Sequence, residues 1–114
     1  MGSTALTARA EIADKRLVRG FSYIGGKWTA AASGQTFPVT DPATGGTIGA
    51  VASLSGEDGL RAVDAAEAAF PVWAGRLPQE RAALLRRWFE AITASREDLA
   101  RTMAREQGKP PPDA

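Results

Sequence analysis

The sequence predicts an α+β chain in which two β-hairpins near the N-terminus precede three amphipathic helices. Three observations support this fold class: a Gly-Gly pair between short aromatic runs, a second Gly-rich turn between two Thr-containing runs, and apolar residues at helical spacing between positions 56 and 107. The last two helices together carry a wide apolar face. We expect that face to need a partner, because an amphipathic helix is stabilised mainly by what covers its apolar side.

The first hairpin is predicted within residues 21–30, where Gly25-Gly26 tolerates positive φ at both positions of a two-residue turn. Closing the turn there places Tyr23 directly across from Trp28. We interpret these two rings as a core pair that sets which face of the hairpin turns inward. The functional alternative is an exposed aromatic platform for a ring-bearing ligand.

A second antiparallel pair is predicted over residues 36–40 and 47–52, on either side of a turn at residues 41–46. Pro38 cannot donate a ladder hydrogen bond, so its strand should be an edge or carry a bulge. The glycines around this turn do not indicate a phosphate loop, because their spacing matches neither G-x-G-x-x-G nor G-x-x-x-x-G-K-[ST].

The first helix is predicted over residues 56–70. Ser55 and Asp58 form a capping-box pattern at its start, and Glu57 lies four residues before Arg61 for an additional ion pair. Pro71 should end or kink this helix, which would leave the following Val-Trp pair in an apolar corner.

Two further helices are predicted over residues 78–93 and 96–107. Pro78 suits the first helical position, Ser95 with Asp98 gives a second capping-box pattern, and Gly108 supplies a left-handed stop before Pro110. The apolar face of the first of these helices is formed by Leu84, Leu85, Trp88, Phe89 and Ile92, and its solvated side by Arg81, Arg86, Arg87 and Glu90.

These patterns divide the chain into three segments. Residues 1–20 are expected to be a flexible or docking segment with some helix, residues 21–110 to be the structured part, and residues 111–114 to be a divergent Pro-rich tail.

Composition excludes several classes of chemistry. The chain has no Cys and no His, so it can supply no thiolate nucleophile, disulfide, imidazole base, or Cys- or His-ligated metal. Its net charge of +1, with acids interleaved among the arginines, argues against binding to nucleic acid. No apolar run is long enough to span a membrane, and we expect a cytoplasmic protein without membrane contact.

Residues 17–110 resemble the N-terminal portion of NAD(P)-dependent aldehyde dehydrogenases, most closely the succinate-semialdehyde dehydrogenase branch. The resemblance is carried in one order by YIGGKW (23–28), TFPVTDPATGGTIG (36–49), VDAAEAAFPVWAGRLPQERAALLRRWFEAI (63–92) and DLARTMAREQGKP (98–110). It implies that the hairpins and helices belong to a larger α/β fold with a Rossmann-like cofactor domain, a catalytic domain and an oligomerisation arm.

The resemblance also implies a chemistry that this chain cannot perform alone. In the family a cysteine thiolate attacks the aldehyde, an asparagine side chain and a backbone N–H hold the oxyanion, hydride passes to the nicotinamide, and a glutamate activates water. Those positions lie beyond the matched portion, and the chain contains neither Cys nor Asn. We therefore assign no catalytic, cofactor-binding or metal-ligating residue, and expect NAD or NADP to be bound only by the full-length family.

We expect an inactive, truncated N-terminal fragment of such an enzyme. The tail at residues 111–114 departs from the family pattern, and a frameshift, a gene-fragment boundary or a natural truncation would each produce it. The alternative is a non-catalytic interaction module that self-associates or docks on a full-length homologue through its apolar helix face. A third possibility, an unrelated small RNA-binding domain, needs an arginine stripe with stacked aromatics, which the interleaved acids contradict.

Overall fold

The computed structural model describes residues 12–108, which form a 3-10 turn, two hairpins and three helices. In chain order the elements are η1 (Lys15–Leu17), β1 (Ser22–Ile24), β2 (Lys27–Thr29), β3 (Thr36–Thr40), β4 (Thr47–Ala52), α2 (Gly56–Ala74), α3 (Pro78–Ala94) and α4 (Arg96–Gln107). Within the described part of the N-terminal segment the only helical element is η1, shorter than the helix expected there. Most of that segment, and the chain from Lys109 onward with its tail, lie outside the described residues.

The β1–β2 hairpin confirms the predicted register. Gly25 and Gly26 have φ of 59° and 79°, and Tyr23 pairs with Trp28 with ring centroids 5.1 Å apart. The expectation of a core pair is wrong, because Tyr23 is 65% exposed and Trp28 is 46% exposed. Arg19 stacks its guanidinium over the Trp28 ring, 4.7 Å from the ring centroid.

The β3–β4 hairpin has the predicted strand bounds. A register shift lies between Val39 and Thr40, one residue beyond Pro38, as expected for a strand that must accommodate a residue without an N–H. The turn is closed by the backbone of Asp41, and the Asp41 carboxylate also accepts a hydrogen bond from the backbone N–H of Ala43 at 2.8 Å.

Helix α2 begins as predicted and ends later than predicted. The capping box between Ser55 and Asp58 is present in both directions. The helix continues through Pro71 to Ala74, so Pro71 does not end it, and Val72 and Trp73 belong to the helix rather than to an apolar corner after it; the alternative, a kink at Pro71, stays a prediction. Because Pro71 lies in the last turn, its missing N–H removes one helical hydrogen bond, and the Pro71 carbonyl still accepts from Gly75 N–H at 3.0 Å. Arg61 pairs with Asp58 rather than with the expected Glu57.

Helices α3 and α4 meet at Ser95. Pro78 occupies the first turn of α3 as predicted, and Gly108 ends α4 with φ of 70°. The predicted capping box at Ser95 is wrong, because Ser95 makes no side-chain capping bond. The carboxylate of Asp98, its expected partner, instead accepts hydrogen bonds from the backbone N–H groups of Ala13 and Asp14, which lie more than 80 residues earlier in the chain.

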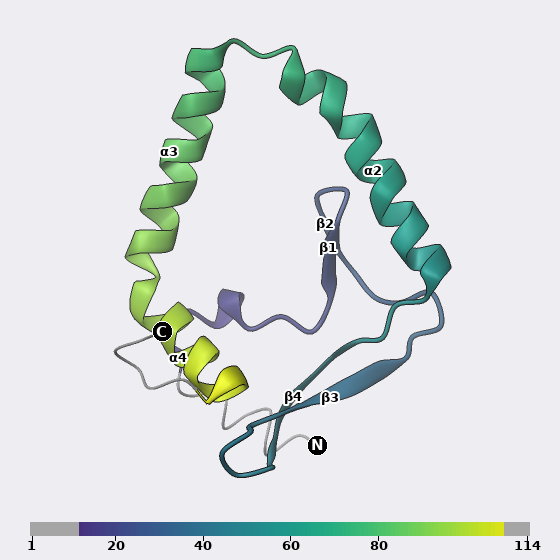
Figure 1. The fold of residues 1–114 in the computed structure, drawn as a ribbon, viewed down its shortest axis with the longest axis vertical. Helices are drawn as coiled ribbons and strands as arrows, with labels where there is room; N and C mark the ends of the chain where they lie inside the picture. The colour runs from purple at the N-terminus through teal and green to yellow at the C-terminus, as the bar shows by residue number, and fades with distance from the viewer. Residues whose placement is uncertain (1–11, 109–114) are drawn as a thin grey trace.

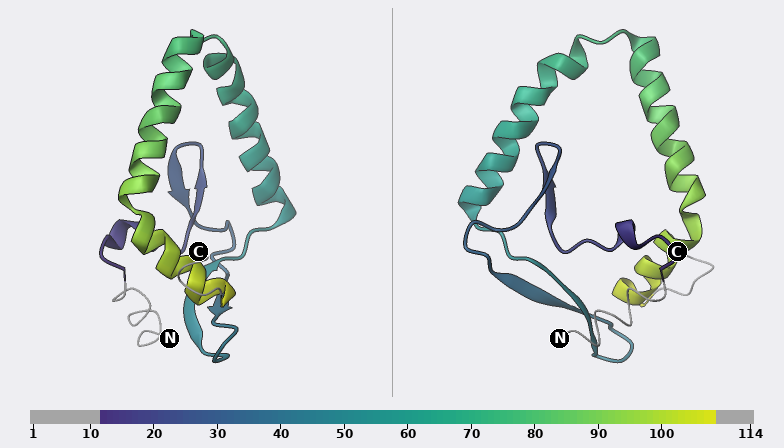
Figure 2. Two further views of the ribbon diagram at one scale, coloured as in Figure 1. Left: turned by 60° about the vertical axis from the view of Figure 1, so that its left-hand side comes forward. Right: turned by 180° about the vertical axis from the view of Figure 1, so that it is seen from behind.

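The elements form a foot and an arch (Figure 1). We call β3, β4, α4 and residues 12–20 the foot, and α2 with α3 the arch. Helices α2 and α3 rise from the foot and meet only through the short link at residues 75–77, with the β1–β2 hairpin standing between them and set back (Figures 1 and 2). Among the described residues, the buried apolar side chains are Ile12, Ala31, Ile48 and Ala52, none of which belongs to the arch.

Candidate functional site

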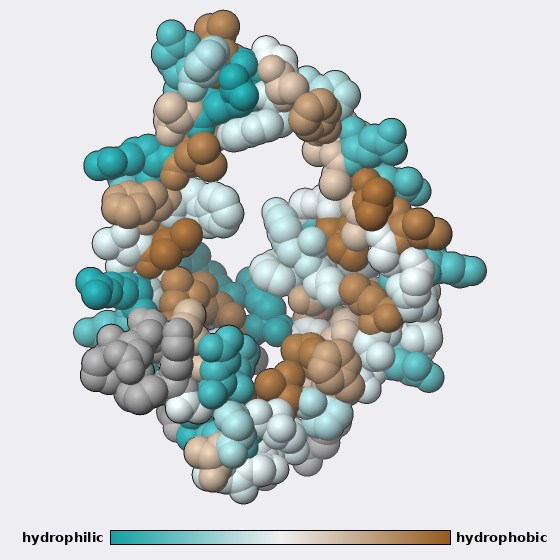
Figure 3. All heavy atoms as spheres, in the orientation of Figure 1, coloured by the Kyte–Doolittle hydropathy of each residue, from teal (hydrophilic) through white to brown (hydrophobic). Residues whose placement is uncertain are grey.

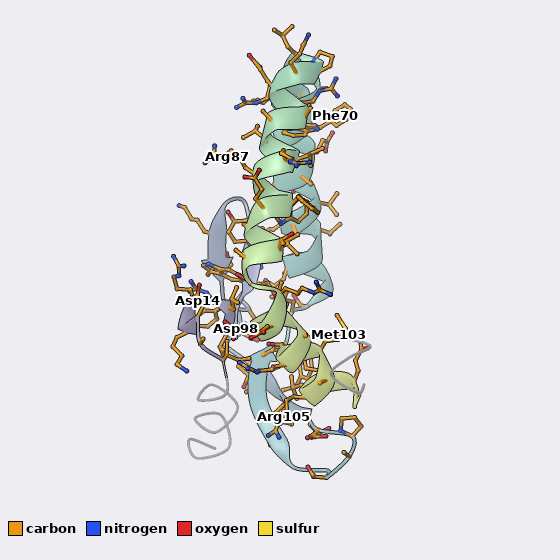
Figure 4. All side chains as sticks on the ribbon, turned by 90° about the vertical axis from the view of Figure 1, so that its left-hand side faces the viewer. Asp14, Phe70, Arg87, Asp98, Met103 and Arg105 are labelled. Carbon is orange, nitrogen blue, oxygen red and sulfur yellow. The ribbon has the colours of Figure 1, made fainter. Side chains whose placement is uncertain are left out.

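Asp98 is a buried carboxylate of the foot. Its Oδ1 accepts the backbone N–H of Ala13 and its Oδ2 accepts that of Asp14, both at 2.9 Å, across more than 80 residues of chain. These two hydrogen bonds, first that from Asp14, hold the pKa of Asp98 below its ordinary value of 3.8. Asp98 and Asp14 lie next to each other at the start of α4 (Figure 4). The carboxylate therefore holds residues 12–20 against α4.

Asp58 plays a similar structural part at the start of α2. It accepts the backbone N–H of Ser55 at 2.9 Å and that of Ala32 at 3.4 Å, and the Ser55 contact is the main cause of its lowered pKa. Asp14 is paired with Arg16, whose side-chain hydrogen bond lowers the pKa of Asp14 to about 2.

These carboxylates are poor candidates for acid–base catalysis. A general base or acid near pH 7 needs a raised pKa and room for a substrate proton, whereas Asp58 and Asp98 have lowered pKa values and oxygens occupied by backbone N–H groups. Over residues 12–108 no group of three or more His, Cys, Asp or Glu side chains is placed to hold a metal ion. The same span contains no helix long and apolar enough to cross a membrane.

A cavity of about 190 Å³ lies in the foot, where residues 12–20, β3–β4 and α4 converge. Its lining is formed by Ile12, Leu17, Val18, Arg19, Gly20, Val39, Ile48, Gly49, Ala50, Val51, Thr102, Arg105 and Glu106. It is smaller than the roughly 300 Å³ at which small-molecule pockets begin. Arg105 at its edge is 3.8 Å from the Asp41 carboxylate, which ties α4 to the β3–β4 turn. Sequence reasoning did not find this cavity, because the three segments that form it are far apart in the chain.

Exposed apolar side chains follow both helices of the arch. We call arch face a set of exposed apolar side chains of its two helices, each 46–69% exposed: Leu60, Val63, Phe70, Leu85, Trp88, Phe89 and Ile92. In Figure 3 hydrophobic side chains follow both helices on the face toward the viewer, and the space between the helices stays open with every side chain drawn. Figure 4 shows Phe70 on that side and Arg87 pointing the opposite way. The prediction of an apolar helix face on α3 is confirmed.

Arg81 departs from the predicted solvated side of α3. It is half-buried, whereas Arg86, Arg87 and Glu90 are exposed as expected. The Nε of Arg81 is buried and has no hydrogen-bond partner among residues 12–108. Position 81 lies three and seven residues before Leu84 and Trp88, so helical spacing already placed it on their side.

Comparison with known proteins identifies relatives of the chain. A sequence profile of the aldehyde dehydrogenase family matches residues 28–114. The chain is 46% identical over 100 residues to glutarate-semialdehyde dehydrogenase of Pseudomonas putida, an alignment that covers 88% of this chain and 21% of the relative. It is 40% identical over 97 residues to the NADP(+) succinate-semialdehyde dehydrogenase of Escherichia coli K12, covering 85% of this chain and 20% of the relative. The chain thus spans about a fifth of the length of these curated relatives, corresponding to their N-terminal part.

Solved structures agree with the sequence comparison. The crystal structure of succinate-semialdehyde dehydrogenase from Burkholderia pseudomallei superposes with a TM-score of 0.85 at 46% identity, over 89% of this chain and 21% of that chain. The P. syringae indole-3-acetaldehyde dehydrogenase, solved with NAD+ bound, superposes with a TM-score of 0.80 at 36% identity, over 84% of this chain and 20% of that chain. The two hairpins and three helices are therefore an arrangement that these longer chains also contain.

Proposed function

Because the chain belongs to the aldehyde dehydrogenase family, we propose that it is the N-terminal structural part of an enzyme that oxidises an aldehyde to a carboxylic acid with NAD(P)+. The parent substrate in this proposal is succinate semialdehyde. The observation that carries it is the identity of 46% and 40% to two relatives named succinate-semialdehyde dehydrogenase. A third relative, 46% identical, is named for glutarate semialdehyde, which like succinate semialdehyde bears an acid group at its other end.

The chain itself is proposed to have no turnover. It contains no Cys to attack the aldehyde and no Asn side chain to hold the oxyanion. Its two buried carboxylates with lowered pKa values already accept backbone hydrogen bonds. Its part in the reaction is then to complete the fold that positions groups supplied by the rest of the enzyme.

The Gly-rich turn at residues 41–46 does not fit a dinucleotide phosphate. A phosphate cradle needs backbone N–H groups that point outward from a loop. In the Gly-rich turn, the N–H of Gly45 donates to the Asp41 carbonyl at 2.7 Å and the N–H of Gly46 to the Thr44 hydroxyl at 3.1 Å. Both groups are used within the turn, so in this proposal the cofactor cleft belongs to the remaining four-fifths of the enzyme.

A chimera tests the proposed function. This chain is fused in place of the matched N-terminal segment of the E. coli succinate-semialdehyde dehydrogenase, and NADP+ reduction is followed with succinate semialdehyde. We expect the chimera to turn over, and the 114-residue chain alone to show neither turnover nor saturable binding of NAD+ or NADP+ by calorimetry. The same chimera with its catalytic cysteine replaced by alanine is the control. Turnover by the chain alone, in proportion to its own dose, contradicts the proposal, as does an inactive but folded chimera.

The arch face favours a second candidate function, that of a non-catalytic interaction module. A surface of this kind suits self-association or docking on a full-length homologue. Analytical ultracentrifugation distinguishes an interaction module from a segment that only completes the enzyme fold. A chain that stays monomeric and binds no full-length homologue would contradict the interaction module.

A further inference from the structure

We propose that residues 12–20 form a hinged strap over the cavity of the foot, with Asp98 as its latch and Gly20 as its fixed end. The strap opens on its own while the hairpins and the three helices stay folded, and its opening gives solvent access to the cavity. This inference rests on contacts within the chain and does not depend on the reaction of the parent enzyme.

The latch joins the start of the strap to α4. The buried carboxylate of Asp98, 8% exposed, accepts one backbone N–H on each oxygen, from Ala13 and Asp14. Figure 4 shows Asp14 beside Asp98. Hydrogen bonds to a charged acceptor are stronger than those between neutral groups. The residue before Ala13, Ile12, is 5% exposed, so a carboxylate and a buried apolar side chain together secure this end of the strap.

The other end of the strap is fixed to β4. The Gly20 carbonyl accepts the backbone N–H of Ala52 at 2.8 Å, and a Cβ at position 20 would lie 3.0 Å from the Ala50 carbonyl oxygen. Glycine therefore lets the backbone of the strap approach the strand closely. Because this hydrogen bond joins backbone to backbone and does not involve Asp98, it can hold while the latch is open.

Between its two ends the strap has hydrogen bonds of its own. The N–H of Leu17 donates to the Asp14 carbonyl at 3.1 Å, and the N–H of Arg16 donates to the Asp14 carboxylate at 3.0 Å. Opening the latch breaks neither of these bonds, so the strap can swing as one piece. The side chains of Lys15, Arg16 and Val18 are exposed already and lose no burial when it does.

The strap forms one wall of the cavity in the foot. Ile12, Leu17 and Val18 line the cavity from the strap, and Val39, Ile48 and Val51 line it from the β3–β4 hairpin. Ile48 is only 9% exposed. Swinging the strap away from α4 therefore uncovers the Ile48 side of the hairpin. Local openings of this kind are typical of segments that bury few apolar side chains, and Ile12 is the buried one among the described residues of the strap.

Cysteine labelling tests the proposal, because the chain contains no Cys of its own. Ile48→Cys places a thiol in the cavity wall that the strap covers, and Ala31→Cys places one at a buried position outside the foot. Each variant of the 114-residue chain is labelled with iodoacetamide. When reclosing is faster than labelling, the labelling rate is proportional to the population of the open form.

The two thiols should respond differently when the latch is weakened. Adding Asp98→Asn leaves one N–H of the strap without an acceptor, so labelling at position 48 should accelerate about tenfold or more. Labelling at position 31 should change less than about twofold. Glu97→Gln, at an exposed neighbour of the latch, should change neither rate.

Equal acceleration at both positions would mean that the chain opens as a whole and would overturn the proposal, as would an unchanged rate at position 48. Where Asp98→Asn does not fold, Ile12→Ala gives the same test from the side of the strap. It removes the buried side chain of the strap and leaves α4 unchanged, so it should also accelerate labelling at position 48 alone.

Discussion

The foot and the arch differ in how far the contacts that their side chains need are made within this chain. In the foot, the buried carboxylate of Asp98 accepts two backbone N–H groups from a distant segment, and three of the buried apolar side chains among the described residues lie there: Ile12, Ile48 and Ala52. In the arch, two long helices have well-formed ends but leave their apolar sides open. The difference shows that secondary structure and local capping are encoded within this segment, whereas the burial of its largest apolar face is not.

The largest expected effect comes from Trp88, which distinguishes the chain alone from the assembled enzyme. In the isolated chain Trp88→Gln should change the free energy of unfolding by no more than about 0.5 kcal/mol, because the side chain is 65% exposed. In the active chimera, where we propose that this side chain is buried, the loss should approach the ~3–5 kcal/mol of a large buried aromatic. Denaturant titrations of both proteins measure the two losses in the free energy of unfolding. Equal losses would contradict the comparison, because Trp88 would then be no more buried in the chimera than in the isolated chain.

Asp98 tests what holds the foot together. Asp98→Asn keeps the size of the side chain but removes one of its two acceptor oxygens, so one backbone N–H of residues 13 and 14 loses its partner. We expect a lower melting temperature and faster proteolysis within residues 12–20. The control is Glu97→Gln, a neighbour whose side chain is 88% exposed and which should be close to neutral. Comparable losses for the two variants would show that the Asp98 contacts do not stabilise the foot.

Three carboxylates with lowered pKa values, Asp98 and Asp14 in the foot and Asp58 at the start of α2, should also make the isolated chain sensitive to acid. The pKa values of Asp98 and Asp58 lie below their ordinary value of 3.8 in the folded chain, and that of Asp14 falls to about 2. A lowered folded pKa contributes stability that is complete above the unfolded pKa and is lost as pH falls through the folded value. Stability should therefore be flat above about pH 5 and fall toward pH 2, with a shallower fall in Asp98→Asn. Circular dichroism against pH measures this, and a fall that begins near neutral pH would contradict it.

Alanine substitutions at two glycines should give the smallest changes in the free energy of unfolding, and these changes should have opposite signs. Gly108→Ala should destabilise by about 1–2 kcal/mol, because φ is +70° and a Cβ there would approach Pro42 Cγ at 3.2 Å. Gly59→Ala inside α2 meets nothing within 4 Å and should stabilise by about 0.5–1 kcal/mol. Thermal unfolding of the pair checks both signs, and destabilisation by Gly59→Ala would mean that α2 is not helical at that position.

Much of the fold could be predicted because its signals are local. Gly25-Gly26 defines a two-residue turn, Ser55 and Asp58 lie three residues apart, and Pro78 and Gly108 mark helix ends, so each is readable within a few residues. Pro71 misled the prediction because a proline within one turn of a helix end removes only one hydrogen bond.

The remaining features depend on contacts that are distant in sequence or absent from this chain. Asp98 carries the same local pattern as Asp58, yet its carboxylate binds the N–H groups of Ala13 and Asp14, and spacing along α4 gives no sign of that choice. Tyr23 and Trp28 have the composition of a core pair but remain exposed in this structure. Sequence patterns predict which face is apolar; they do not say which chain covers it.

Amide hydrogen exchange, measured on the 114-residue chain alone and on the same segment within the chimera, tests the central claim most directly. We predict that amides of α2 and α3 exchange far more slowly in the chimera than in the chain alone, while those of β3, β4 and α4 change much less. Equal protection of the arch in both samples would contradict the claim that this segment relies on the rest of an aldehyde dehydrogenase to complete its structure.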